Sequence, residues 1–214
     1  MLGERFEQAL AFTNQLHRKQ KRKTSGVPYV GHLLGVAAMV IEDGGGEDEA
    51  IAALLHDSLE DQGRHYQGGV PALAAEIERR FGGEVRRMVE ALTECSSDEE
   101  RAISDKRERW RAHKRAYFAQ IASAGPDVRR ISCADSLYNT RSLAMGFRQL
   151  GPRLWTRFMT GRGDDQIWAY RSAAEAFRAA GTGHLADELA AAVDELERMV
   201  GNGNGSRGNA RGGV

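Results

Sequence analysis

The sequence predicts an all-α fold of about ten helices. Apolar residues recur at helical spacing along nearly the whole chain, and glycines and prolines divide these segments at short intervals. No stretch alternates convincingly between apolar and polar residues, except a short extended piece around residues 27–30. With 214 residues, 41% of them hydrophobic, the chain is long enough to bury one substantial core. We therefore expect a single domain over residues 1–200.

The first two helices are separated by a basic loop. The first helix carries an apolar stripe over residues 6–16 and ends before Gly26 and Pro28, which favour a turn. The second helix covers residues 32–41 and stops at the three glycines of residues 44–46. The loop between them, KQKRKTSGVPY, holds most of the positive charge in this part of the chain.

Three more helices complete the first half. The third begins near Glu47, where acidic residues in the first turn suit the helix dipole, and continues through AALLHDSLEDQ, residues 52–62. The fourth has Pro71 in its first turn and apolar residues at every fourth position up to Phe81. Two glycines then break it, and the fifth helix covers residues 85–92.

The second half is predicted to contain five helices and a tail. A polar SSDEE segment with a candidate N-cap precedes a long helix that carries Trp110 and Ile121, and Gly125-Pro126 ends it. The remaining helices are expected from Asp127 through Asn139 and at residues 151–160, 164–180 and 184–200. Residues 201–214, GNGNGSRGNARGGV, have too few apolar side chains to pack and are predicted to form a disordered Gly/Asn-rich tail.

The composition excludes several classes of protein. Thirty basic and thirty acidic side chains cancel, so no overall positive field favours nucleic acid or an anionic membrane surface. The cysteines, Cys95 and Cys133, form no CxxC motif, which argues against a disulfide framework or a zinc knuckle. The N-terminus lacks the apolar region of a signal peptide, and no apolar run is long enough to span a membrane. We expect a cytoplasmic protein, and the sequence specifies no protein partner.

The segment AALLHDSLEDQ is the first indication of chemistry. A run of apolar residues leads directly into His56, Asp57, Glu60 and Asp61. On a helix, His56 and Glu60 are neighbours one turn apart, and so are Asp57 and Asp61. Three carboxylates this close repel one another unless a cation lies among them. A divalent metal held by His56 and Asp57 would leave Glu60 and Asp61 beside a water that the metal activates.

Other parts of the chain offer the remaining ligands. His32 begins the second helix, and Asp135 lies on a later helix with Asn139 one turn further on. Two imidazoles and two carboxylates suit manganese, iron or zinc better than magnesium or calcium. The spacing permits this convergence without requiring it. The alternatives are that the acidic motif is a solvated helix end, that His32 caps its helix, and that Asp135 is a buried acid bonded to the backbone.

Four segments carry a resemblance to a known family. They are QLHRKQKRKTSGVPYVGH, AALLHDSLED, FGGEVRRMVEALT and CADSLYNTR. In this order they resemble the HD-domain hydrolases of the RelA/SpoT group, and in particular the stand-alone small alarmone hydrolases that lack a synthetase domain. The likeness extends over roughly residues 5 to 145. It implies an all-helical HD-domain fold, one Mn²⁺ ion, and removal of the 3′-pyrophosphate from guanosine tetra- and pentaphosphate, (p)ppGpp, to give GDP or GTP and pyrophosphate.

The resemblance also implies a role for individual residues. The metal ligands would be His32, His56, Asp57 and Asp135, and Glu60 and Asp61 would act on the attacking water. Arg22 and Lys23 would lie beside the nucleotide, where an arginine plane can stack on a purine, and Asn139 and Ser142 would contact the sugar and phosphates. Two positions depart from the family pattern: Leu33 stands where a proline is usual, and Gln62 where a threonine is usual.

Alternatives remain at the basic residues and for the substrate. Arg22 and Lys23 also fit a solvated loop, and solvent is the favoured environment for Arg107, Arg111, Lys114 and Tyr117 in a segment that resembles the family only loosely. The same machinery would serve another nucleotide, as an NADPH 2′-phosphatase or a 5′-nucleotidase. A non-catalytic nucleotide-binding regulatory module is the third possibility, although a degenerate member should lack one of the metal ligands or acidic residues.

Overall fold

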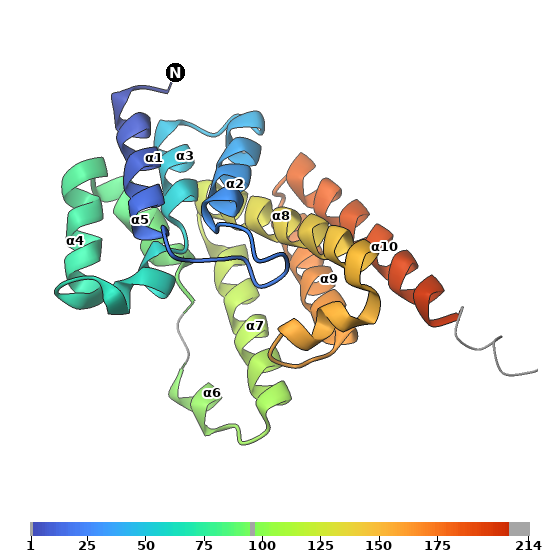
Figure 1. Ribbon diagram of the computed structural model, residues 1–214. Helices are drawn as coiled ribbons and strands as arrows, with labels where there is room; N and C mark the ends of the chain where they lie inside the picture. Colours follow the sequence, from blue (N-terminus) through green and yellow to red (C-terminus); the bar gives the residue numbers. More distant parts are fainter. Residues whose placement is uncertain (1, 95–96, 206–214) are drawn as a thin grey trace, which may run out of the picture.

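The computed structural model describes residues 2–94 and 97–205, and within these ranges it is built from helices (Figure 1). Its ten α-helices are α1 (Glu4–Leu16), α2 (Val30–Glu42), α3 (Glu47–Leu55), α4 (Gly69–Phe81), α5 (Gly83–Leu92), α6 (Asp98–Ala102), α7 (Lys106–Ser123), α8 (Pro126–Leu150), α9 (Gly163–Ala179) and α10 (His184–Gly205). A π-helical turn, η1 (Ser58–Gln62), and two 3-10 segments, η2 (Gly63–His65) and η3 (Gly151–Arg157), connect some of them. The predicted all-α fold with about ten helices is confirmed.

Helix α3 lies at the centre of the N-terminal half of the molecule. It packs against α1, α2, α5 and α8. The side chains of residues 50–55 are all fully buried. A helix that is apolar on every side must be surrounded by other helices, so the apolar run that precedes His56 delivers this histidine to the interior.

Helix α8, with 25 residues, runs beside α2, α9 and α10 (Figure 1) and contributes residues to both hydrophobic cores of the described chain. Its first half contributes Ile131 and Leu137 to the main core, which also includes α3. Its second half packs Phe147 against Trp155 of η3 and belongs to a smaller core closed by α10. Asp135, the expected metal ligand that α8 carries, lies on the first half, and α8 also contacts α2 and α3.

Several boundaries differ from the predictions. Residues 151–157 form a 3-10 segment and no α-helix, and the expected extended piece is reduced to one isolated bridge between Lys21 and Pro28. Helix α10 continues to Gly205, five residues into the segment predicted to be a tail. Residues 206–214 lie outside the described residues, so their disorder stays a prediction, as does the single domain over residues 1–200.

Smaller expectations can also be followed in the structure. Ser97 of the SSDEE segment caps α6, because its hydroxyl accepts a hydrogen bond from the Glu100 amide at 3.1 Å. Cys133 is buried with a free thiol, whereas Cys95 lies outside the described residues. No helix in the described part of the chain is long and apolar enough to cross a membrane.

A buried acid ties α7 to α9. Asp165 is 0% exposed and accepts hydrogen bonds of 2.6–2.9 Å from the guanidinium groups of Arg107 and Arg111. Burial opposes ionisation of Asp165, but the two arginines outweigh it and hold its pKa below the ordinary value. The prediction that Arg107 and Arg111 simply face solvent is therefore wrong: both are used to position α9 against α7.

Asp165→Ala should destabilise the protein because it leaves two guanidinium groups without their carboxylate. We expect a loss of about 2–3 kcal/mol in the free energy of unfolding, below the roughly 3–5 kcal/mol of fully buried pairs because both arginines keep some contact with water. Urea denaturation measures it. The matched control is Asp164→Ala, which removes an exposed pair with Arg162 and should change stability by less than about 1 kcal/mol. Equal losses at both positions would contradict this role of Asp165.

Candidate metal centre and active site

The motif HDSLED lies just beyond the end of α3 and is not part of that α-helix. Helix α3 ends at Leu55, His56 and Asp57 form a turn, and residues 58–62 follow as the π-helical η1. The prediction that one α-helix carries the whole motif is therefore wrong. Short π-helical insertions widen the backbone turn and are frequent at functional sites. Here the break separates the buried histidine from Glu60 and Asp61, which line a cavity.

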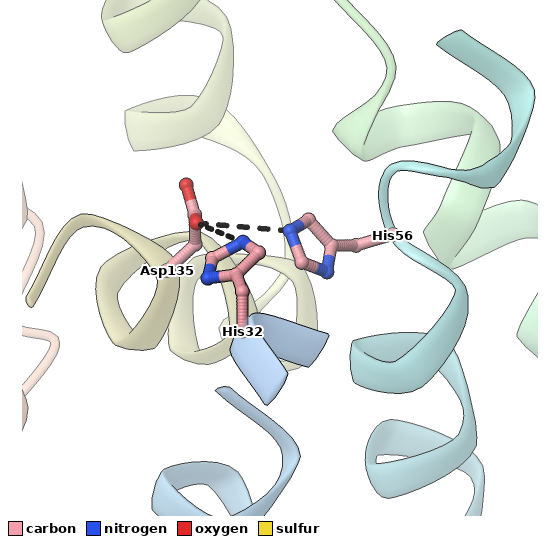
Figure 2. Close-up of side chains that lie close together, drawn as sticks. All are labelled: His32, His56 and Asp135. Atoms are coloured by element: carbon pink, nitrogen blue, oxygen red, sulfur yellow. Dashed lines mark ion pairs between the residues drawn. The ribbon is translucent and has the colours of Figure 1, made fainter. Parts of the chain in front are cut away.

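Three side chains from three helical regions converge at the end of α3 (Figure 2). His32 comes from α2, His56 from the turn after α3, and Asp135 from α8, and one ligand atom of each lies within 4.8 Å of the others. Asp135 Oδ1 is 3.2 Å from His32 Nε2 and 3.7 Å from His56 Nε2. Both histidines are buried, and Asp135 is half-buried. The sequence alone permitted this convergence, and the structure brings it about.

Asp57 completes the cluster from the side. Its Oδ2 lies 3.0 Å from His56 Nε2 and 3.5 Å from His32 Nε2. The same oxygen accepts a 2.6 Å hydrogen bond from the Tyr29 hydroxyl. Asn139 donates to Asp135 Oδ1 at 2.7 Å. Both carboxylates are thus oriented by a neighbour, as the ligands of protein metal sites usually are.

The tautomer of His56 identifies the atom that would bind a cation. Its Nδ1 lies 2.7 Å from the Ala53 carbonyl oxygen, to which it can only donate. In the neutral ring, Nε2 then carries a lone pair, and this buried atom has no hydrogen-bond partner among the described residues. It faces the oxygens of Asp57 and Asp135. A lone pair that faces two carboxylates is unfavourable, so this nitrogen calls for either a proton or a metal cation beside it.

The electrostatics of the cluster lead to the same conclusion. Burial opposes a charge on His56, but Asp57 and Asp135 outweigh it and raise the pKa of the imidazole well above its ordinary value. Burial is also outweighed at the two acids, where the histidines hold both pKa values below the ordinary range. The site therefore attracts positive charge. A divalent metal with mixed nitrogen and oxygen ligands fits this donor set, with His32, His56, Asp57 and Asp135 around it.

A cavity of about 310 Å³ opens beside the cluster. Asp57 and Asp135 lie in its wall together with Glu60 and Asp61. Its other walls come from the basic loop, the segment after α5, α7, α8 and α9. They include Gln20, Lys21, Arg22, Lys23, Thr24, Tyr29, Glu94, Trp110, Lys114, Tyr117, Ser136, Asn139, Gln166 and Tyr170. The carboxylates and the cationic side chains thus share one hollow, which suits a ligand that carries phosphates.

Arg22 has a fixed position in this wall. Its guanidinium carbon lies 5.5 Å from the centroid of the Tyr29 ring and 5.8 Å from that of Tyr138, and one nitrogen donates to Asn139 Oδ1 at 2.6 Å. Tyr138 in turn packs on Gly35 of α2, where an added Cβ would lie 2.0 Å from the ring. Arg22 is half-buried and held by aromatic rings, unlike a solvated loop residue, whereas Lys23 is exposed at the cavity rim.

Glu60 and Asp61 stand in different surroundings. The pKa of Glu60 is raised to about 7, first by partial burial and then by the carboxylates of Glu94, Asp57 and Asp61, with Lys114 acting in the opposite direction. A carboxylate with a pKa near neutrality is suited to accept a proton in catalysis. Asp61 instead accepts a hydrogen bond from the Gln20 amide at 2.6 Å.

Several cavity residues were missed or misplaced by sequence reasoning. The prediction that Lys114 and Tyr117 face solvent is wrong, because both line the cavity, and Lys114 pairs with Glu94 at 2.6 Å. Tyr29 could have been noticed from its place after Pro28, whereas Tyr170, on α9, and Glu94, in the segment after α5, carry no local signal because the fold brings them in from distant parts of the chain. Ser142 is half-buried two turns beyond Asp135 and is not among the residues that line the cavity, so its contact with substrate stays a prediction.

Comparison with known proteins places this fold and site in a family. The sequence profile of the HD domain matches residues 9–160. A human protein named guanosine-3′,5′-bis(diphosphate) 3′-pyrophosphohydrolase MESH1 is 34% identical over 139 residues, which cover 64% of this chain and 68% of the human one. A protein from Aquifex aeolicus named guanosine-3′,5′-bis(diphosphate) 3′-pyrophosphohydrolase is 34% identical over 141 residues, 66% of this chain and 18% of its own length.

Solved structures agree with these sequences. A structure described as a metazoan ortholog of SpoT that hydrolyses ppGpp aligns with a TM-score of 0.68 and 26% identity, over 94% of this chain and 98% of that one. A crystal structure of a Listeria monocytogenes protein aligns with a TM-score of 0.56, also at 26% identity, over 79% and 96% of the two chains.

The helical fold and the buried His–Asp cluster define a hydrolase of the HD class, and the chain belongs to the HD-domain family. Its resemblance to the stand-alone hydrolases of the RelA/SpoT group is confirmed by relatives that match it along most of their length.

Metal content should separate the ligands from the residues that act on water. Asp57→Ala removes a carboxylate beside both histidines and should abolish metal binding, whereas Glu60→Ala should leave the metal in place and remove turnover. Elemental analysis of the two purified variants, together with an activity assay, decides between them. If both variants lose the metal equally, Glu60 is itself a ligand and this division of roles is wrong.

The raised pKa of Glu60 should appear as a pH-dependent stability of the metal-free protein. Between the ordinary value of 4.5 and about 7 the folded state keeps a proton that the unfolded chain has released, so stability falls as the pH rises through this window. Glu60→Gln removes this penalty. The side chain of Glu60 is partly open to water, so the effect on stability is smaller than the full pKa shift implies. We expect Glu60→Gln to raise the free energy of unfolding at pH 8 by about 0.5–1 kcal/mol, which corresponds to roughly 1–4 °C in Tm.

At about pH 4 the same substitution should leave Tm unchanged, because Glu60 is protonated in both states. Glu175→Gln, which makes the same change at an exposed position on α9 away from the cavity, is the control and should not raise Tm. A gain of equal size at both pH values would mean that the glutamine packs better, and would contradict the titration.

Proposed function

We propose that this protein is a metal-dependent 3′-pyrophosphohydrolase of (p)ppGpp that uses Mn²⁺. The observation that carries the proposal is the buried His56 Nε2, which faces two carboxylates at the inner end of a cavity whose other walls hold Arg22, Lys23 and Lys114. The relatives named as ppGpp hydrolases support the choice of substrate. In this proposal the protein acts in the cytoplasm.

The reaction exchanges one bond for another. A water oxygen attacks the phosphorus bound to the ribose 3′ oxygen, the P–O3′ bond breaks, and the ribose hydroxyl and pyrophosphate are released, so that ppGpp and water give GDP and pyrophosphate. A metal held by His32, His56, Asp57 and Asp135 would supply Lewis-acid chemistry for activating water and polarising a phosphoryl oxygen. Glu60 accepts the proton of the attacking water.

The remaining residues hold the reacting groups in place. Asp61 orients the water, and Arg22 presents its guanidinium plane to the nucleotide base from between two tyrosine rings. Lys23 and Lys114 add positive charge where the phosphates lie. A chain with no net charge thus obtains the local field that a highly anionic substrate requires.

A nucleotide panel tests the proposal. Chelator-treated protein should be inactive and should recover with Mn²⁺, and ppGpp should yield GDP and pyrophosphate in equal amounts. Orthophosphate released from NADPH or from a 5′-nucleotide, with ppGpp untouched, would favour the rival phosphatases. Tight nucleotide binding without turnover of any substrate would instead favour a regulatory module.

Arg22→Ala should raise KM for ppGpp more than it lowers kcat. The guanidinium lies beside the nucleotide and not at the reacting phosphorus, and a contact made equally in ground and transition states appears in KM. Loss of a partly desolvated cation–π contact of about 1–2 kcal/mol predicts a rise of roughly five- to thirty-fold. Arg22→Lys should recover only part of the loss, because ammonium keeps the charge without the plane.

Steady-state kinetics at fixed Mn²⁺ measures these constants. Arg18→Ala is the matched control, since this exposed arginine precedes the same loop but does not line the cavity. Its KM should stay within about twofold of the parent. A collapse of kcat with unchanged KM in Arg22→Ala would place this arginine at the reacting phosphate instead.

A further inference from the structure

A chain of side-chain hydrogen bonds runs behind the two acidic residues and ends on Asp61. Gln20 Nε2 donates to Asp61 Oδ2 at 2.6 Å. Gln62 Nε2 donates to Gln20 Oε1, also at 2.6 Å. His17 Nδ1 reaches the same oxygen at 2.7 Å, and its Nε2 lies 3.3 Å from the hydroxyl of Ser58. These groups come from the end of α1, the basic loop and η1.

The carboxylate fixes the direction of every bond in this chain. If the Gln20 amide were reversed, its oxygen would lie 2.6 Å from a carboxylate oxygen, which leaves no hydrogen between two acceptors. Gln20 Oε1 therefore points away from Asp61 and accepts from both Gln62 and His17. His17 is buried, burial lowers the pKa of its imidazole, and the neutral ring that results carries its hydrogen on Nδ1 and accepts from Ser58 through Nε2.

Gln20 needs these supports because of where it lies. It is half-buried, and together with Asp61 it lines both the active-site cavity and a second, more open hollow of about 680 Å³ formed with Arg18, Lys19 and Arg64. A side chain in a wall between two hollows has little packing to hold its amide. Two donors on Oε1 supply that constraint, and one of them is Gln62, the residue that stands where the family usually has threonine.

We propose that Gln20 is a positioning residue for Asp61 and that Gln62 acts through Gln20. Engagement of Oδ2 by Gln20 fixes the carboxylate plane and leaves Oδ1 to orient the attacking water. A threonine at position 62 ends too close to its own backbone to supply the amide, so the chain is a feature of this sequence. The inference rests on the proposed function only for the role of Asp61.

The kinetic test uses methionine, which keeps the length of glutamine and removes its amide. Gln20→Met should lower kcat for ppGpp roughly 10- to 100-fold, the range for misplacement of a reacting group by up to about 1 Å. KM should stay within about twofold, and metal content should be unchanged. Gln62→Met and Gln62→Thr should lower kcat less, by about three- to ten-fold, and should add nothing once Gln20 is methionine.

Two kinetic results would overturn the proposal. If KM rises in Gln20→Met while kcat stays unchanged, Gln20 contacts the substrate directly. If the losses at positions 20 and 62 multiply, the two glutamines act independently. Gln15→Met, on the exposed surface of α1, is the matched control and should leave both constants unchanged.

A readout without substrate separates this inference from the proposed activity. In the side-chain amide region of a ¹H–¹⁵N spectrum of the metal-free protein, the Gln20 signal is identified by its loss in Gln20→Met. It should shift in Asp61→Asn and in Gln62→Met, and should stay in place in Gln15→Met. An unmoved signal in Asp61→Asn would exclude the hydrogen bond, whatever the substrate is. If the signal shifts but ppGpp is not hydrolysed, the proposed function fails and the hydrogen-bond chain remains.

Discussion

The structure is organised around a buried histidine nitrogen that faces two carboxylates. His56 donates through Nδ1 to a backbone carbonyl, so its Nε2 is left facing Asp57 and Asp135, where a proton or a metal cation balances the negative charge. An arrangement of this kind depends on each participant being held by its own element, and a bound cation would stabilise it further. The fully buried α3 delivers His56, α2 delivers His32, and the middle of α8 delivers Asp135, so three segments distant in sequence depend on one another at a single point.

Once the cluster is placed, the rest of the cavity follows from the paths of the helices. The backbone abandons α-helical geometry immediately after α3, and the π-helical turn directs Glu60 and Asp61 toward solvent while the histidine stays inside. The basic loop faces them from the other side, held by the Tyr29 hydroxyl on Asp57 and by Arg22 on Asn139. Opposite charges are therefore separated within one hollow in a chain whose total charge is zero.

The helical fold and the motif around His56 could be predicted from sequence because their signals are local: helical periodicity and glycine breaks define the elements, and the motif itself holds a histidine and three acids. His32 and Asp135 carry no such local signal and are assigned through the resemblance to a family. Lys114 and Tyr117 could not be assigned, because the pattern of α7 does not reveal which face meets the cavity and which arginines are used by Asp165. The end of α3 at Leu55 was also beyond prediction, since the residues that follow favour a helix in isolation.

Gly35 is a position at which the packing leaves no room for a side chain. The Tyr138 ring occupies the space that any side chain at position 35 would need, and this ring is one of the two that flank Arg22. A methyl group added at position 35, where it would face Tyr138, would therefore displace one of the two rings that hold Arg22 in the cavity wall. The position of Arg22 in the cavity wall therefore depends on the backbone of α2, and a substitution at position 35 can disturb it without changing any residue that lines the cavity.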